Sequence, residues 1–123
     1  NGAEEIATAL AVHRAHGTTR SVISLVANPL VDVRESLALV ASLADDDPTI
    51  VGSHLEGPFL AIGRRGAHAP EFLREPDPQT IQGLIDTGRG TIRQVTIAPE
   101  LPGALDAVRQ FVDAGLVVAI GHT

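Results

Sequence analysis

Hydrophobic positions along the chain follow two alternating patterns. In the first, apolar residues recur every three or four positions, which is typical of helices that bury one face. In the second, short continuous apolar runs rich in Val and Ile are typical of strands that are covered on both sides. The helical pattern occupies residues 3–17, 31–48, 76–90 and 102–116. The strand pattern occupies residues 20–27, 49–57, 91–100 and 116–123.

Within the helical segments, the spacing also predicts which side chains face a core and where two ends lie. Asp77 followed by Pro78 is typical of a helix start, and Gly88 or Gly90 is expected to follow the end of that helix. Three core-facing stripes are predicted: Ile6, Ala7, Leu10 and Ala11; Val33, Leu37, Val40, Ala41 and Ala44; and Leu105, Val108, Phe111 and Val112.

The regular alternation of strands and helices predicts an α/β fold. Strands that are separated by helices pair in parallel through right-handed crossovers. About four parallel strands of this kind fit either a segment of a barrel or an open doubly wound sheet. No linker composition interrupts the chain, so one domain over residues 1–123 is the simplest organisation.

Composition narrows the classes of function. Of the 123 residues, 44% are hydrophobic and 20% are charged, so a packed domain is expected rather than a disordered segment. The formal net charge is −6, all nine basic residues are Arg, and the only aromatic residues are three Phe. Nucleic-acid binding needs basic patches and aromatic platforms, so this composition argues against it.

Neither a disulfide framework nor a membrane span is expected. The chain has no Cys, and no apolar run approaches the roughly 20 residues that a membrane helix needs. No signal peptide is recognisable, because the first helical segment is amphipathic and carries Glu4 and Glu5. We therefore expect a cytoplasmic protein.

Ionisable side chains stand where three of the predicted strands end. They are His54 and Glu56, Glu100, and His122. In parallel α/β folds the carboxyl ends of the strands form the rim of the active site. Alternation along the strand places Glu56 on the same face as His54, and it points His122 the same way as Val118 and Ile120.

A carboxylate at a strand end is costly unless it is paired, solvated or bound to a cation. Carboxylate oxygens and imidazole nitrogens are suitable ligands for zinc and iron. The pattern therefore favours a cation site at Glu56 and His122, which only the fold could bring together. A hydrogen-bonded structural role for each residue stays open at this point.

Four motifs make the chain similar to a known family. They are HLEGPFL at residues 54–60, GAHAPEFLREP at 66–76, TIAPE at 96–100 and AIGHT at 119–123. In this order they resemble the N-acetylglucosamine-6-phosphate deacetylases of the amidohydrolase superfamily. The resemblance extends from about residue 16 to the last residue.

The resemblance implies that residues 1–123 are part of a metal-dependent (β/α)8 TIM-type barrel domain. A whole barrel needs about 250 residues. The family's amino-terminal His-x-His segment, its later metal-binding histidine and its phosphate-binding residues have no counterpart here. Its catalytic aspartate is expected beyond Thr123, so no catalytic residue is assigned in this chain. We do not expect this segment to be active alone.

The resemblance also implies a function, deacetylation of N-acetylglucosamine 6-phosphate to glucosamine 6-phosphate and acetate. Glu56 and His122 match metal ligands of the family, for a divalent ion such as zinc or iron. His68 matches a histidine that contacts the sugar, and the backbone near Ala67 lies beside it. The implied partner is a small amino-sugar phosphate, and the full-length protein is implied to be a homodimer. His54 and Glu100 are expected to have supporting or structural roles only.

Two other functions compete with this one. A metal-free sugar-phosphate isomerase or epimerase could use a similar barrel, and a non-catalytic scaffold could keep the barrel without the chemistry. The loop at residues 61–70 is a candidate lid, in which Arg64 and Arg65 would attract an anionic sugar phosphate. An ordinary exposed loop with solvated arginines is the alternative.

Overall fold

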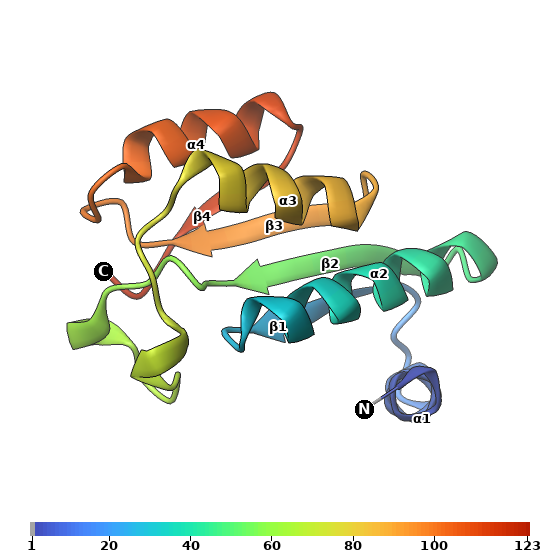
Figure 1. Cartoon of the computed structure of the whole chain (residues 1–123). Coiled ribbons are helices and arrows are strands. Elements are labelled where there is room, and N and C mark those ends of the chain that lie inside the picture. Colours follow the sequence, from blue (N-terminus) through green and yellow to red (C-terminus); the bar gives the residue numbers. More distant parts are fainter. Residues whose placement is uncertain (1) are drawn as a thin grey trace.

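The computed structural model describes residues 2–123, which form a parallel sheet with helices packed against it (Figure 1). The strands are β1 (Ser21–Val26), β2 (Ile50–Glu56), β3 (Ile92–Ile97) and β4 (Val117–Ile120). They lie side by side in chain order, and every neighbouring pair is parallel. The predicted α/β class and its four parallel strands are confirmed. Within residues 2–123, the outer edges of β1 and β4 have no strand partner.

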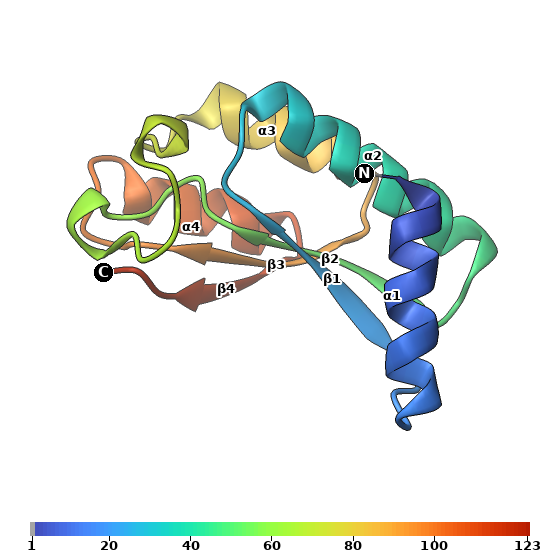
Figure 2. The same cartoon turned by 90° about the horizontal axis from the view of Figure 1, so that it is seen from below.

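The helices lie in two places (Figures 1 and 2). Three of them cover one face of the sheet: α2 (Leu30–Asp46), α3 (Pro78–Gly88) and α4 (Ala104–Asp113). The first helix, α1 (Ala3–Ala15), lies apart from these three and near β1. Two short 3₁₀ turns, Ile62–Arg64 and Pro70–Phe72, lie beyond the carboxyl ends of the strands. None of the helices in the described part of the chain has the length and apolar character that a membrane crossing requires.

The main core fills the space between the sheet and α2, α3 and α4. Phe59 and Phe111 are both fully buried there, with ring centroids 6.2 Å apart. A smaller cluster joins Leu10 of α1 to Val40 and Ile50. Other fully buried members of the main core are Leu37, Leu55, Leu84, Val95 and Ile97.

The helical spacing located the buried face of α2 but only part of the buried faces of α1 and α4. All four buried residues of α2 belong to the predicted stripe, whereas Leu10 is the one buried residue among those described in α1. In α4, Leu105 and Val112 are 65% and 54% exposed, so their prediction was wrong. The buried residues of α4 are Ala104, Ala107 and Phe111. The two small alanines let the helix pack closely on the sheet, and the larger residues beside them turn outward.

The start of α3 is determined by its capping residue. The Asp77 carboxylate accepts a hydrogen bond of 2.8 Å from the backbone N–H of Thr80, and Pro78 occupies the first turn. The helix includes Gly88 as its last residue, so Gly90, and not Gly88, is the predicted glycine that follows its end. The residue in left-handed conformation that follows is Arg89, with φ of 47°, and not a glycine.

β2 contains one position that only glycine can fill. Gly52 has φ of 144°, and a Cβ atom there would lie 1.9 Å from the backbone oxygen of Thr91. The β2–β3 register shifts directly afterwards, between Ser53 and His54. As a result, His54 is in register with Gln94 and Glu56 with Thr96. The close approach of the Gly52 and Thr91 backbones thus lies next to the register shift that places Thr96 beside Glu56.

We call the face of the sheet opposite α2, α3 and α4 the open face. Parallel register places two rows of side chains across it, because partners in neighbouring strands point the same way. The first row is Ser24, His54, Gln94 and Val117, and the second is Val26, Glu56, Thr96 and Ala119. Polar groups are therefore concentrated on the face that the helices leave uncovered.

Candidate metal centre

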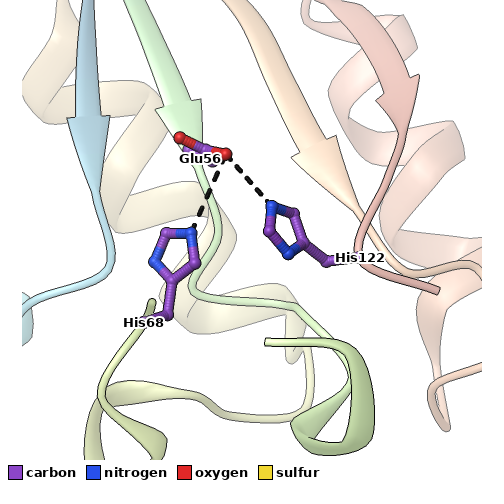
Figure 3. A group of neighbouring side chains, drawn as sticks. All are labelled: Glu56, His68 and His122. Carbon is purple, nitrogen blue, oxygen red and sulfur yellow. Dashed lines mark hydrogen bonds and ion pairs between the residues drawn. The ribbon is translucent and has the colours of Figure 1, made fainter. Parts of the chain in front are cut away.

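Three side chains from different parts of the chain converge beyond the carboxyl ends of the strands (Figure 3). Glu56 is the last residue of β2, His122 follows β4, and His68 belongs to the loop between the two 3₁₀ turns. Glu56 Oε1 lies 3.1 Å from His122 Nε2 and 3.8 Å from His68 Nε2. One nitrogen or oxygen from each residue lies within 4.8 Å of the other two. The predicted ligands Glu56 and His122 are thus brought together, and His68 joins them.

His122 reaches this position through its backbone conformation. β4 ends at Ile120, and His122 has φ of 52°. Non-glycine residues rarely adopt this conformation, and those that do are concentrated at functional sites. The expectation that His122 points the same way as Val118 and Ile120 is wrong. Val118 packs against the helix-covered core, whereas the imidazole of His122 meets Glu56 on the open face. The left-handed conformation breaks the alternation of the strand.

Backbone hydrogen bonds hold His122 in this conformation. The backbone N–H of Ala61 donates to the His122 carbonyl at 3.1 Å, and the N–H of Gly121 donates to the Ile97 carbonyl at 3.2 Å. His122 Nδ1 lies 2.9 Å from the backbone oxygen of Arg64. Because a carbonyl only accepts, Nδ1 carries a proton and donates it. This fixes the ring so that Nε2 faces Glu56.

The pKa shifts of His122 and Glu56 are consistent with each other. Hydrogen bonding to the Arg64 carbonyl, followed by that to Glu56, raises the pKa of His122 above its ordinary value. The hydrogen bond from His122 is the main cause that lowers the pKa of the Glu56 carboxyl, against the opposing effect of burial. Both shifts favour the state in which Glu56 is ionised and His122 carries a second proton, on Nε2. Since Nδ1 keeps its own proton, a cation could replace the proton on Nε2.

His68 and Ala67 belong to the wall of a cavity beside the three side chains. The His68 side chain is only 8% exposed, and its ring meets that of His122 edge to face, with centroids 5.0 Å apart. The cavity measures about 490 Å³. Its wall consists of Val26, Ala27, Asn28, Glu56, Ala67, His68, Ala69, Phe72 and His122. A ligand in this cavity would contact the predicted cation ligands and the predicted sugar contacts together.

The loop that carries His68 is tied to the site. The backbone N–H of Arg74 donates to the Pro58 carbonyl at 3.1 Å, which closes the neck of the loop. Inside the loop, His122 accepts from Ala61 and donates to Arg64, as described above. The side chains of Arg64 and Arg65 are exposed, so their role in attracting a phosphate stays a prediction.

His54 and Glu100 lie near the site without joining the cluster. His54 Nδ1 is 2.9 Å from Ser24 Oγ, and His54 Nε2 is 2.8 Å from Thr96 Oγ1. Burial lowers the pKa of His54 and so favours the neutral ring, against a smaller opposing effect of the Glu56 charge. Glu100 accepts a hydrogen bond of 2.6 Å from the Thr123 hydroxyl.

Several contacts at the site have no signal in the sequence. The contact between His68 and Glu56 depends on the path of a loop without periodicity, and the Arg64 carbonyl contributes only its backbone. Ser24 and Thr96 are ordinary members of apolar runs in the sequence. The strand register pairs Ser24 with His54 and Thr96 with Glu56, and from there the Thr96 hydroxyl reaches His54.

Comparisons with known proteins identify relatives of the chain, although no protein-family model matches it. The chain is 32% identical over 125 residues to the N-acetylgalactosamine-6-phosphate deacetylase of Escherichia coli O157:H7. It is 34% identical over 110 residues to the N-acetylglucosamine-6-phosphate deacetylase of Vibrio furnissii. These matches cover 98% and 87% of this chain, but only 33% and 28% of the relatives.

Solved structures give the same result. The N-acetyl-D-glucosamine-6-phosphate deacetylase of Mycobacterium smegmatis is 48% identical with a TM-score of 0.95, over 98% of this chain and 32% of that one. The same values hold for its D267A mutant in complex with N-acetyl-D-glucosamine-6-phosphate. The Pasteurella multocida enzyme is 26% identical with a TM-score of 0.78, over 86% of this chain and 28% of that one.

The chain spans about a third of the length of the relatives that it matches. Its four parallel strands and their helices match part of a TIM-barrel-type deacetylase, as the sequence motifs implied. Over most of its length the chain is thus similar to a segment of the N-acetylglucosamine-6-phosphate deacetylases.

Proposed function

We propose that the whole protein removes the acetyl group from N-acetylglucosamine 6-phosphate by hydrolysis of its amide bond. The convergence of Glu56, His68 and His122 beside one cavity carries this proposal. It is supported by the similarity to the M. smegmatis deacetylase, a mutant of which has been solved in complex with that compound. The match to an N-acetylgalactosamine-6-phosphate deacetylase makes the epimeric sugar the first alternative substrate.

The donor set fits a divalent cation of the zinc or iron type. Glu56 offers a carboxylate oxygen, and His122 offers an imidazole nitrogen whose ring is fixed by the Arg64 carbonyl. The two atoms already face each other, and only a proton on Nε2 would have to leave. Such a cation would lower the pKa of water and polarise the amide carbonyl.

The remaining steps fall to side chains of the protein. Glu56 and His122 hold their donor atoms in place, and His68, nearly buried on the cavity wall, orients the sugar with the backbone near Ala67. The group that accepts the proton of the attacking water and returns it to the amine is assigned outside this segment. Within residues 2–123, no aspartate belongs to the cavity wall.

The test is acetate release by the full-length protein that contains this chain. Glu56→Gln removes the charge of the proposed ligand at almost constant volume, and we expect activity and bound metal to fall by about a hundredfold or more. Glu75→Gln is the matched control, because Glu75 is exposed and lies outside the cavity wall. Full activity of Glu56→Gln without bound metal would exclude this mechanism and favour a metal-free reaction.

A further inference from the structure

Three strands are joined across the open face by side chains that have no direct contact with the cavity. Ser24 and His54 of the first row and Thr96 of the second form a diagonal row, with nitrogen–oxygen distances of 2.9 Å and 2.8 Å at the two ends of the imidazole. A neutral imidazole has one donor and one acceptor nitrogen, and each hydroxyl can take either role. The row is therefore fully satisfied without any charge.

Thr96 lies between the two proposed cation ligands. It is the register partner of Glu56, and its backbone carbonyl accepts a hydrogen bond of 3.3 Å from the N–H of Gly57. On its other side, its methyl group packs against Gly121, the residue before His122. A Cβ atom on Gly121 would lie 2.7 Å from Thr96 Cγ2. Thr96 thus touches the chain next to both ligands.

The bond to His54 determines which way the Thr96 side chain points. Thr has two different substituents on Cβ, and rotation about χ1 would exchange the hydroxyl and methyl positions. With Oγ1 directed to His54, Cγ2 is directed to Gly121. Ser24 fixes the far side of the imidazole, so His54 itself has little freedom to turn.

We propose that His54 is a positioning residue of the cation centre: it fixes the Thr96 side chain, and Thr96 sets the separation of Glu56 and His122. The inference rests on the proposed cation site, but it assigns roles to Ser24, His54 and Thr96 that the proposed function does not require. Ligand supports of this kind change metal affinity about tenfold to a hundredfold when they are lost.

The experiment measures cation affinity in the full-length protein by competition of Zn²⁺ with a chromophoric chelator. The visible spectrum of the Co²⁺-loaded protein reports ligand geometry independently of activity. Thr96→Val keeps the shape and removes the bond to His54, and His54→Ala removes the imidazole. We expect each to weaken Zn²⁺ binding by about tenfold to a hundredfold and to change the Co²⁺ spectrum.

Two further variants test the path and the specificity of the effect. If His54 acts through Thr96, the double variant His54→Ala/Thr96→Val will bind Zn²⁺ little more weakly than either single variant. Thr91→Val is the matched control, since the Thr91 hydroxyl also makes one hydrogen bond, to the Gly88 carbonyl, just before β3 begins. We expect it to lower the thermal unfolding midpoint without changing Zn²⁺ affinity.

The outcomes separate the positioning role from its alternatives. Unchanged Zn²⁺ affinity and an unchanged Co²⁺ spectrum in both His54→Ala and Thr96→Val would show that the row serves stability alone. If His54→Ala does not fold, Ser24→Ala removes only the outer bond, and its expected loss of a few-fold in affinity tests the same idea. Absence of Zn²⁺ binding in the unmodified protein would instead overturn the proposed cation centre itself.

Discussion

The two faces of the sheet use the same strands for different purposes. On the covered face, Leu55 and Val95 are fully buried under α2, α3 and α4. On the open face, their neighbours Glu56 and Thr96 are polar and partly exposed, and Val26 beside them is 49% exposed. Alternate residues of β2 and β3 therefore separate the packed core from the candidate site. Substitutions on the covered face should mainly change unfolding, and substitutions on the open face should mainly change binding.

The largest expected effect is on the covered face. Phe111→Ala removes a fully buried ring that packs on Phe59, and we expect the free energy of unfolding to fall by about 3–5 kcal/mol. Denaturant unfolding of the full-length protein measures this loss. Val112→Ala, on the exposed side of the same helix, should cost less than about 0.5 kcal/mol. Equal losses for the two variants would contradict the buried face described for α4.

On the open face, His68→Asn should affect binding more than unfolding. We expect KM for N-acetylglucosamine 6-phosphate to rise about tenfold to a hundredfold, because the proposed contact of the nearly buried His68 side chain with the sugar would be lost. Bound metal, measured by elemental analysis, should stay at the level of the unmodified protein. Loss of metal together with activity would instead make His68 a third ligand, which its distance from Glu56 and His122 also permits.

Cation affinity should depend on pH through the His122–Glu56 pair. The raised pKa of His122 means that its proton stabilises the cation-free fold below the unfolded-state pKa, and this contribution is lost as pH rises through the folded-state pKa. The lowered pKa of Glu56 gives the opposite sign, with stability lost as pH falls through its folded-state value.

A cation competes with the His122 proton, so the cation affinity should fall about tenfold per pH unit below the His122 pKa. Zn²⁺ titrations between pH 5 and 8, about the ordinary pKa of histidine, would measure this slope. A flat profile would show that Nε2 is not a ligand.

The smallest effect concerns the loop over residues 61–70. Because His122 holds this loop through Ala61 and Arg64, removal of the cation should loosen it. We expect trypsin to cleave after Arg64 or Arg65 several-fold faster in chelator-treated protein, since cleavage tracks local opening. Cleavage after Arg20, which lies outside the site before β1, should keep its rate and serves as the internal reference. An identical cleavage rate after Arg64 with and without Zn²⁺ would show that the cation does not stabilise the loop.

More of the covered face than of the open face could be predicted from the sequence. The stripe of α2 and the strand identities follow from local periodicity, which burial under helices enforces. Glu56 follows from alternation and from its place at a strand end. The stripe of α4 failed at Leu105 and Val112, because packing of its small alanines determined the buried side.

The rest of the site depends on features that no local pattern contains. His122 enters the site through a left-handed backbone conformation, contrary to strand alternation. The row of Ser24, His54 and Thr96 depends on the β2–β3 register shift beside Gly52. His68 and Ala67 were predicted from the family motifs alone, because composition and spacing give no reason to select either residue.

In the described part of the chain the outer edges of β1 and β4 pair with no further strand, and this has a practical consequence for work with this segment. Exposed apolar side chains lie on these two strands, such as Val22 of β1 and Ile120 of β4. Strand edges of this kind recruit further strands, so a protein truncated to residues 1–123 should self-associate edge to edge and precipitate on concentration. Its apparent size in solution would then report aggregation and not native assembly.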